Sequence, residues 1–141
     1  MLDKSTFAKK YSMKFWETEL NKSIQKAIED LGFETLTPIQ KEAIPYLLEH
    51  ETDLIALAQT GTGKTAAFGL PTLHKIEIQR KLPQAIILCP TRELCLQISK
   101  DMTSYSKYTK GLKVMPVYGG TSITPQIKSL KSGTQIIVGT P

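Results

Sequence analysis

Eight residues, AQTGTGKT from Ala58 to Thr65, constrain the fold of this chain more than any other stretch. They follow an apolar run at 54–58 and precede three apolar residues, which is the order of a buried strand, a glycine-rich turn and a helix start. Gly61 and Gly63 can adopt backbone angles that a side chain forbids, so that N–H groups turn inward around an anion. A helix beginning near Gly63 adds unpaired N–H groups and the positive end of its dipole. The stretch predicts a phosphate-binding loop.

The side chains of this loop suit a nucleoside triphosphate with Mg²⁺. Lys64 supplies a mobile positive charge for the β- and γ-phosphates, and the Thr65 hydroxyl suits a Mg²⁺ ligand, so these two are the candidate catalytic residues. The usual pattern opens with glycine, and Ala58 takes that place here. The alternative is a chance turn, which a Gly-Lys-Thr run in this context disfavours. The candidate nucleotide-binding residues of the loop are Ala58, Gln59, Thr60, Gly61, Thr62, Gly63, Lys64 and Thr65.

Composition narrows the class of protein. The 141 residues are enough for one domain, and the net charge of +5 is compatible with a polyanionic partner or with a solvated basic surface. Cys89 and Cys95 are too few for a metal cage and fit buried free thiols in a reducing compartment. The first ten residues lack the apolar core of a signal peptide, and no apolar run is long enough to span a bilayer. We therefore expect a cytoplasmic protein without a membrane segment.

Hydrophobic periodicity predicts strands that alternate with helices. The expected helices cover 16–31, a stretch starting at Pro38 with the Thr37 hydroxyl as its cap, the stretch from 63 to about 79, 92–105, and a short stretch from Thr124-Pro125 to Leu130. The first helix is expected to bury one face formed by Leu20, Ile24, Ala27, Ile28 and Leu31. The expected strands cover 54–58, 85–89, 113–118 and 135–138. This alternation indicates an α/β fold with a parallel β-sheet flanked by helices.

All four expected strands end in distinctive residues. The first runs into the phosphate loop, and the others run into PTREL, GGT and GTP. Each of the last three has an ordinary alternative as a helix cap or a turn. Carboxyl ends of parallel strands share one edge, where hydroxyls, glycine N–H groups and an arginine suit phosphate contacts. The candidate nucleic-acid-binding residues are Pro90, Thr91, Arg92, Gly119, Gly120 and Thr140.

Gln40 and Phe15 are candidates for recognising the base of the nucleotide. An amide matches the N6 donor and N7 acceptor of adenine, whereas guanine presents two acceptors there. An aromatic ring such as Phe15 can stack on a base. Taken alone, Gln40 is more often a solvated helix residue and Phe15 a core residue.

These motifs, in this order, resemble the N-terminal RecA-like domain of DEAD-box RNA helicases over essentially the whole chain. GFETLTPIQ, within residues 13–41, is similar to the Q motif of that family, with Leu36 where proline is usual. AQTGTGKT is similar to motif I, in which the leading alanine is normal. PTREL resembles motif Ia, Gly119-Gly120 the GG motif, and 139–141 the opening of motif Ib.

The resemblance implies part of an ATP-dependent RNA helicase, an ATP hydrolase that remodels RNA duplexes or RNA–protein complexes. It implies ATP and Mg²⁺ as cofactors, with Phe15 and Gln40 at adenine and 61–65 at the phosphates. It implies RNA as a partner along the strand ends, together with a second, C-terminal RecA-like domain of the same protein. In that family, the strands carrying the next two motifs lie between the phosphate-loop strand and the motif Ia strand. We therefore expect exposed strand edges and poor stability in these 141 residues alone.

No Asp or Glu directly follows an apolar strand run, so no carboxylate is assignable to hold Mg²⁺ and position water. We therefore expect no meaningful ATP hydrolysis by the chain as given. One alternative is a truncated, non-catalytic module that binds nucleotide or RNA. Another is a different phosphate-loop enzyme, such as a kinase or a GTPase, although the guanine-reading Asn-Lys-x-Asp is absent.

Overall fold

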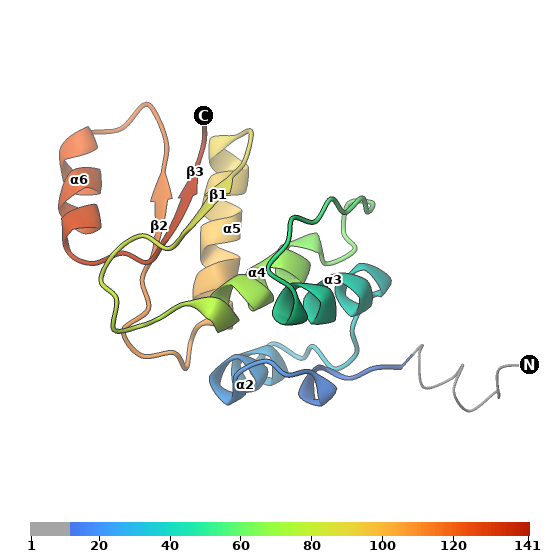
Figure 1. The fold of residues 1–141 in the computed structure, drawn as a ribbon. Coiled ribbons are helices and arrows are strands. Elements are labelled where there is room, and N and C mark those ends of the chain that lie inside the picture. Colours follow the sequence, from blue (N-terminus) through green and yellow to red (C-terminus); the bar gives the residue numbers. More distant parts are fainter. Residues whose placement is uncertain (1–11) are drawn as a thin grey trace, which may run out of the picture. The chain divides into compact units, whose positions relative to one another are not determined.

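The computed structural model describes residues 12–141, which belong to two compact units with the boundary after His74 (Figure 1). The N-terminal unit contains the 3₁₀ turn η1 (Phe15–Glu17) and the helices α2 (Lys22–Asp30), α3 (Pro38–Glu49) and α4 (Lys64–Lys75), the last of which ends one residue past the boundary. Its core is formed by apolar side chains from all four elements and from the connections between them. Those that are almost fully buried include Phe15, Leu20, Ile24, Ala27, Ile28, Leu36, Ala43, Ile44, Ala66, Ala67, Leu70 and Leu73.

The first helix is shorter than its apolar pattern predicts. The Thr18 hydroxyl donates to the carbonyl oxygen of Phe15 and closes the η1 turn, and α2 begins only at Lys22. Trp16 therefore lies outside the helix and is exposed. Leu31 follows the last helical residue and is also exposed, so its expected place in the apolar face was wrong. The other four residues of that face are buried as expected.

The Thr37-Pro38 signal marks the start of α3, as expected, with Thr37 as the N-cap residue. Gln40 takes part in a capping box with Thr37, and its Oε1 accepts a hydrogen bond from the Thr37 backbone N–H at 2.9 Å. Among the described residues, the buried Thr37 Oγ1 has no hydrogen-bond partner. Pro45 lies inside α3, and one helix continues through it to Glu49. Gln40, the candidate for recognising the base, thus also helps to form the start of α3.

The strand expected at 54–58 does not form. Residues 53–59 have no regular secondary structure, and Ile55 and Leu57 are each 92% exposed. A strand is defined by ladder hydrogen bonds to a neighbour, and no strand in the described part of the chain pairs with this segment. The apolar pattern alone was therefore insufficient to form a strand, because the segment has no neighbouring strand to pair with in the described part of the chain.

The C-terminal unit is a three-stranded parallel sheet with flanking helices, which confirms the α/β fold class. Its strands are β1 (Ala85–Leu88), β2 (Val114–Val117) and β3 (Ile136–Gly139), in the spatial order β1-β3-β2. The register places Leu88 and Val117 beside Gly139, so all three strands end at one edge. The helix α5 (Arg92–Tyr105) packs against β2 and β3, and α6 (Ile123–Lys131) packs against β2 (Figure 1).

Among the remaining helices, the predicted range of α5 is confirmed, with Ile98 and Met102 buried. The boundaries of α4 and α6 differ from expectation by a few residues. The helix α4 ends at Lys75 rather than near Gln79, since the following segment turns and is held by the side chain of Gln84. The helix α6 begins at Ile123, so Thr124 lies inside it and does not cap it.

The free edge of β1 is open to pairing with another chain. Ala85 and Cys89 donate backbone hydrogen bonds towards β3, so the alternate residues Ile86 and Leu88 direct their N–H and C=O groups away from it. Their side chains are also exposed, at 66% and 69%. The opposite edge is β2, where Pro116 has no N–H to offer. The β1 edge thus lacks the protection that the β2 edge has.

We therefore expect the 141-residue chain to self-associate as its concentration rises. Replacing Ile86 by lysine should suppress this association, because a charge on an open edge disfavours strand addition. Val114→Lys, on the edge that already carries a proline, is the matched control and should leave the association unchanged. Sedimentation velocity over a concentration series measures the effect. A chain that stays monomeric and melts in one sharp, cooperative transition would contradict the expectation.

Candidate functional site

The glycine-rich loop has the conformation that its sequence predicts. Gly61 and Gly63 have φ values of 74° and 80°, in the left-handed region that favours glycine. The Thr62 hydroxyl donates to the carbonyl oxygen of Gln59 at 2.6 Å and tightens the turn. The helix α4 begins at Lys64, so its unpaired N–H groups open at the end of the loop.

Lys64 turns back over the loop. Its Nζ donates to the Ala58 carbonyl oxygen at 2.8 Å, which brings the ammonium group to the first residue of the loop. In the part of the chain that the structure describes, no carboxylate forms a salt bridge with this group. The loop therefore carries a positive charge whose partner is a neutral carbonyl.

Gln40 ties α3 to the loop. Its side chain is 3% exposed, and its Nε2 donates to the Gly63 carbonyl oxygen at 3.1 Å. A Cβ atom at Gly63 would overlap with this Nε2, so glycine is required there for space as well as for φ. The interpretation of Gln40 as a solvated helix residue was therefore wrong. Its amide lies beside the glycine-rich loop, with both ends in hydrogen bonds.

Phe15 lies in the core of the N-terminal unit. It is 3% exposed, and its ring stacks on Phe33 with 6.3 Å between centroids and 30° between planes. Phe15 therefore packs as a core residue, which is the alternative that burial tendencies favoured. The stacking of Phe15 on a base stays a prediction.

The three motifs that follow the strands of the sheet meet at its carboxyl edge. Cys89 donates its N–H to the Gly139 carbonyl oxygen at 2.9 Å, and Thr140 donates to the Val117 carbonyl oxygen at 3.1 Å. Pro90, Thr91, Arg92, Gly119, Gly120 and Thr140 all follow directly from these strand ends. The fourth strand end expected at this edge does not belong to the sheet, because 54–58 forms no strand.

Two side chains at this edge have defined contacts. Thr91 Oγ1 accepts from the Leu94 N–H at 3.2 Å, so it caps α5, as the ordinary alternative proposed. The Arg92 guanidinium carbon lies 4.6 Å from the ring centroid of Tyr118. Sequence analysis missed Tyr118, although an aromatic residue directly before Gly119 was a signal for it.

The two cysteines lie beneath this edge as buried free thiols, as expected. Cys95 Sγ donates to the Val138 carbonyl oxygen at 3.0 Å. Burial, with a smaller effect of the nearby Cys95, raises the pKa of the Cys89 thiol. Cys89 is therefore a packed thiol and not an activated nucleophile.

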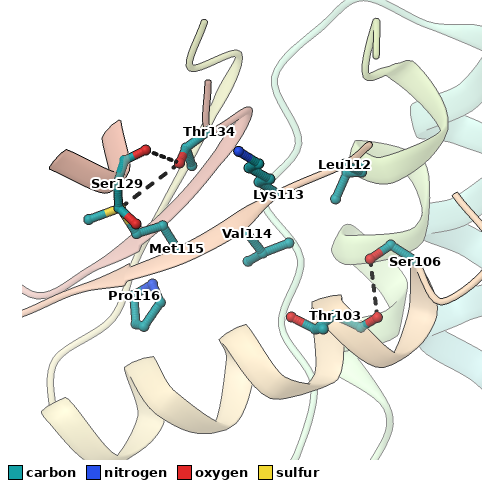
Figure 2. Close-up of a pocket in the computed structure, with 9 residues that line it drawn as sticks. All are labelled: Thr103, Ser106, Leu112, Lys113, Val114, Met115, Pro116, Ser129 and Thr134. Atoms are coloured by element: carbon teal, nitrogen blue, oxygen red, sulfur yellow. Dashed lines mark hydrogen bonds between the residues drawn. The ribbon is translucent and has the colours of Figure 1, made fainter. Parts of the chain in front are cut away.

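A separate cavity of about 340 Å³ lies beside β2, with α5 and α6 contributing to its walls (Figure 2). Lys113 and Thr134 precede β2 and β3, so this end of the cavity is away from the carboxyl edge. Its polar groups bond to neighbouring protein atoms: Thr134 Oγ1 donates to the Ser129 carbonyl oxygen, and Ser106 Oγ donates to that of Thr103. Because these hydroxyls already bond to protein atoms, the cavity does not indicate a particular class of ligand.

Two kinds of feature are absent from the described residues. No group of three or more His, Cys, Asp or Glu side chains in residues 12–141 is arranged to hold a metal ion. Within the same residues, no helix has the length and apolar character needed to cross a membrane.

A family model described as DEAD/DEAH box helicase matches residues 37–141, from the start of α3 to the end of the chain. The chain belongs to the DEAD/DEAH box helicase family. The match includes the glycine-rich loop and all three motifs at the sheet edge. The resemblance read from the sequence is therefore confirmed.

Individual relatives of this DEAD/DEAH box chain agree. It is 52% identical over 128 residues to the ATP-dependent RNA helicase CshA of Listeria monocytogenes, covering 91% of this chain and 24% of that protein. It is 46% identical over 127 residues to the ATP-dependent RNA helicase DeaD of Escherichia coli K12, covering 90% and 20%. The crystal structure of a DEAD box protein from the hyperthermophile Methanococcus jannaschii matches with a TM-score of 0.86 and 43% identity, covering 92% and 35%. The chain thus spans about a quarter or less of these two curated relatives.

Proposed function

We propose that this chain binds ATP with Mg²⁺ at the loop 58–65 and binds RNA along the carboxyl edge of the sheet. It would do so as part of the N-terminal RecA-like domain, spanning residues 1–141 with the Q-motif region at 13–41, of an ATP-dependent RNA helicase. The observation that carries the proposal is the hydrogen bond from Gln40 Nε2 to the Gly63 carbonyl oxygen. It joins the candidate base reader directly to the candidate phosphate loop.

The loop has the chemistry that a triphosphate needs. Two glycines with positive φ and the start of α4 provide backbone N–H donors, and the Lys64 ammonium has no carboxylate partner among the described residues. An incoming phosphate oxygen can replace the neutral Ala58 carbonyl as the acceptor for Lys64 Nζ, which gives a stronger, charge-assisted hydrogen bond. Gln40 would then exchange its hydrogen bonds with the Thr37 N–H and the Gly63 carbonyl oxygen for bonds to the adenine edge, and Phe15 is the proposed stacking partner.

The fit to Mg²⁺ is partial, as is usual for this ion. Thr65, in the first turn of α4, offers one hydroxyl oxygen. Mg²⁺ usually takes only one or two protein ligands beside substrate phosphates and water. When bound, the ion would neutralise charge on the phosphates, while Lys64 and the loop N–H groups hold them in place.

The carboxyl edge suits the backbone of a nucleic acid. Arg92, the Thr140 hydroxyl and the N–H groups of Gly119 and Gly120 are phosphate-contact groups. Contacts of this kind carry little base information, so we propose sequence-tolerant RNA binding. The proposed partners are RNA and a second RecA-like domain of a longer protein, and the proposed location is the cytoplasm.

Gln40→Ala should relax the preference for ATP over GTP. The amide is the candidate group that matches adenine and mismatches guanine, so its loss removes the discrimination. Competition of ATP and GTP for a fluorescent ATP analogue, measured on both proteins, reports the preference. Gln25→Ala, at a partly buried amide on α2, is the matched control. Discrimination that survives Gln40→Ala would limit Gln40 to its structural hydrogen bonds.

The purified chain should bind ATP and RNA without RNA-stimulated ATP turnover above background. Within residues 12–141, no carboxylate directly follows a strand of the sheet to hold Mg²⁺ and orient the attacking water. Phosphate release is measured with and without single-stranded RNA. Binding without turnover also fits the alternative function, a non-catalytic nucleotide- and RNA-binding module. Measurable stimulated turnover would contradict the prediction and exclude that alternative.

A further inference from the structure

The contact between Arg92 and Tyr118 joins two segments that are not neighbours in the sheet. Arg92 opens α5 after β1, and Tyr118 follows β2, while β3 lies between these two strands. The guanidinium carbon lies 4.6 Å from the centre of the Tyr118 ring. The pair therefore bridges the carboxyl end of the central strand, where Thr140 leaves β3.

The ring of Tyr118 is the contact that the structure shows for the Arg92 guanidinium. Arg92 is an exposed side chain with many rotamers, and among the described residues no carboxylate forms a salt bridge with it. A guanidinium placed over an aromatic face is held by the ring and still has its N–H donors at its periphery. A salt bridge would instead occupy those donors. The aromatic contact thus limits the motion of the group while leaving it available to an anion.

We propose that Tyr118 is a positioning residue that holds the Arg92 guanidinium at the carboxyl edge of the sheet for contact with an RNA phosphate. This inference rests on the proposed RNA-binding function. Tyr118 lies directly before Gly119 and Gly120, so the ring and the two glycines belong to the segment that follows β2, and the Arg92 contact links this segment to the one that follows β1. Because the arginine is already ordered before RNA binds, less conformational entropy is lost on binding.

The test is a double-mutant cycle on the 141-residue chain, with fluorescence anisotropy of a labelled single-stranded oligouridylate as the readout. Arg92→Ala should weaken RNA binding about tenfold or more, since it removes a charge-assisted hydrogen bond. Tyr118→Leu should weaken it about two- to fivefold, and Tyr118→Phe, which keeps the ring, should restore wild-type affinity. In the Arg92→Ala background, Tyr118→Leu should have no further effect. Circular dichroism checks that each variant is folded.

Tyr108→Leu is the matched control. Tyr108 is also half-buried in the C-terminal unit and has a cation over its ring, Lys107 at 5.0 Å, but it follows the end of α5 and not the end of a strand. RNA affinity should not change in this variant. A loss of affinity equal to that of Tyr118→Leu would overturn the inference, since it would reflect general destabilisation.

The remaining outcomes separate the inference from the function on which it rests. RNA binding that is indifferent to Tyr118→Leu would overturn the inference alone. A Tyr118→Leu loss that persists in the Arg92→Ala background would also overturn it, because the ring would then act on RNA directly or through the fold. A chain that does not bind RNA would overturn the proposed function and the inference together.

Discussion

Replacing Lys64 by alanine should lower the affinity of the chain for ATP about tenfold or more, because at least one charge-assisted hydrogen bond to phosphate is lost. In the structure, the Lys64 ammonium lies over the loop and donates to the Ala58 carbonyl oxygen. No other lysine or arginine lies within the loop 58–65. The free energy of unfolding should change by no more than about 0.5 kcal/mol, as is usual for an exposed side chain. Calorimetric titration with ATP and chemical denaturation measure the two quantities.

Lys75→Ala is the control for this substitution. Lys75 is the last residue of the same helix, α4, and is exposed, so its removal changes the net charge equally without reaching the loop. ATP affinity should be unaffected in this variant. If both substitutions lower the ATP affinity equally, Lys64 acts only through the net charge of the chain. If Lys64→Ala leaves the ATP affinity unchanged, Lys64 does not belong to the ATP site.

Gly63→Ala should damage both the loop and its contact with α3. At a φ of 80°, any side chain is strained, and the new Cβ would overlap with Gln40 Nε2. The amide must then leave its hydrogen bond to the Gly63 carbonyl oxygen, although it is buried. We expect the free energy of unfolding to fall by about 1–3 kcal/mol. ATP binding should become too weak to measure under conditions where the unmodified chain binds it, because the loop N–H groups lose their orientation.

Gly61→Ala separates the two causes of this effect. Gly61 has a similar φ of 74°, but a Cβ there meets no atom within 4 Å. Gly61→Ala should therefore lower the free energy of unfolding only through backbone strain, by about 1–2 kcal/mol. Denaturation and ATP titration of both variants give the comparison. If Gly63→Ala is no more harmful than Gly61→Ala, Gln40 can move aside without cost, and its link to the loop is not important.

Local sequence signals predicted the features that depend on neighbouring residues. Thr91 before α5 and the positive φ of Gly61 are examples, because capping and backbone strain act within a few residues. The range of α5 was also predictable, since its apolar residues repeat with helical period. Errors of a few residues at α2 and α4 come with side chains such as those of Thr18 and Gln84, which bond to the backbone beside these helices.

Features that depend on distant partners were not predictable in the same way. The apolar segment around Ile55 has a strand pattern but remains unpaired, and the Arg92–Tyr118 contact joins residues across a strand that the chain reaches only later. Gln40 had no sequence signal for burial, because its hydrogen bond to Gly63 crosses 23 positions.

The amino-acid sequence by itself determined the glycine loop, the order of the helices and of the three strands that form, and the set of motifs that identifies the family, because each is written in consecutive residues. The tertiary structure decided which strands pair, that Gln40 is buried beside Gly63, and that Tyr118 lies under Arg92. Each of these requires two segments far apart in the chain to come within a few ångströms. Parallel pairing in particular depends on the availability of a neighbour, and β1 and β3 have one where 54–58 does not.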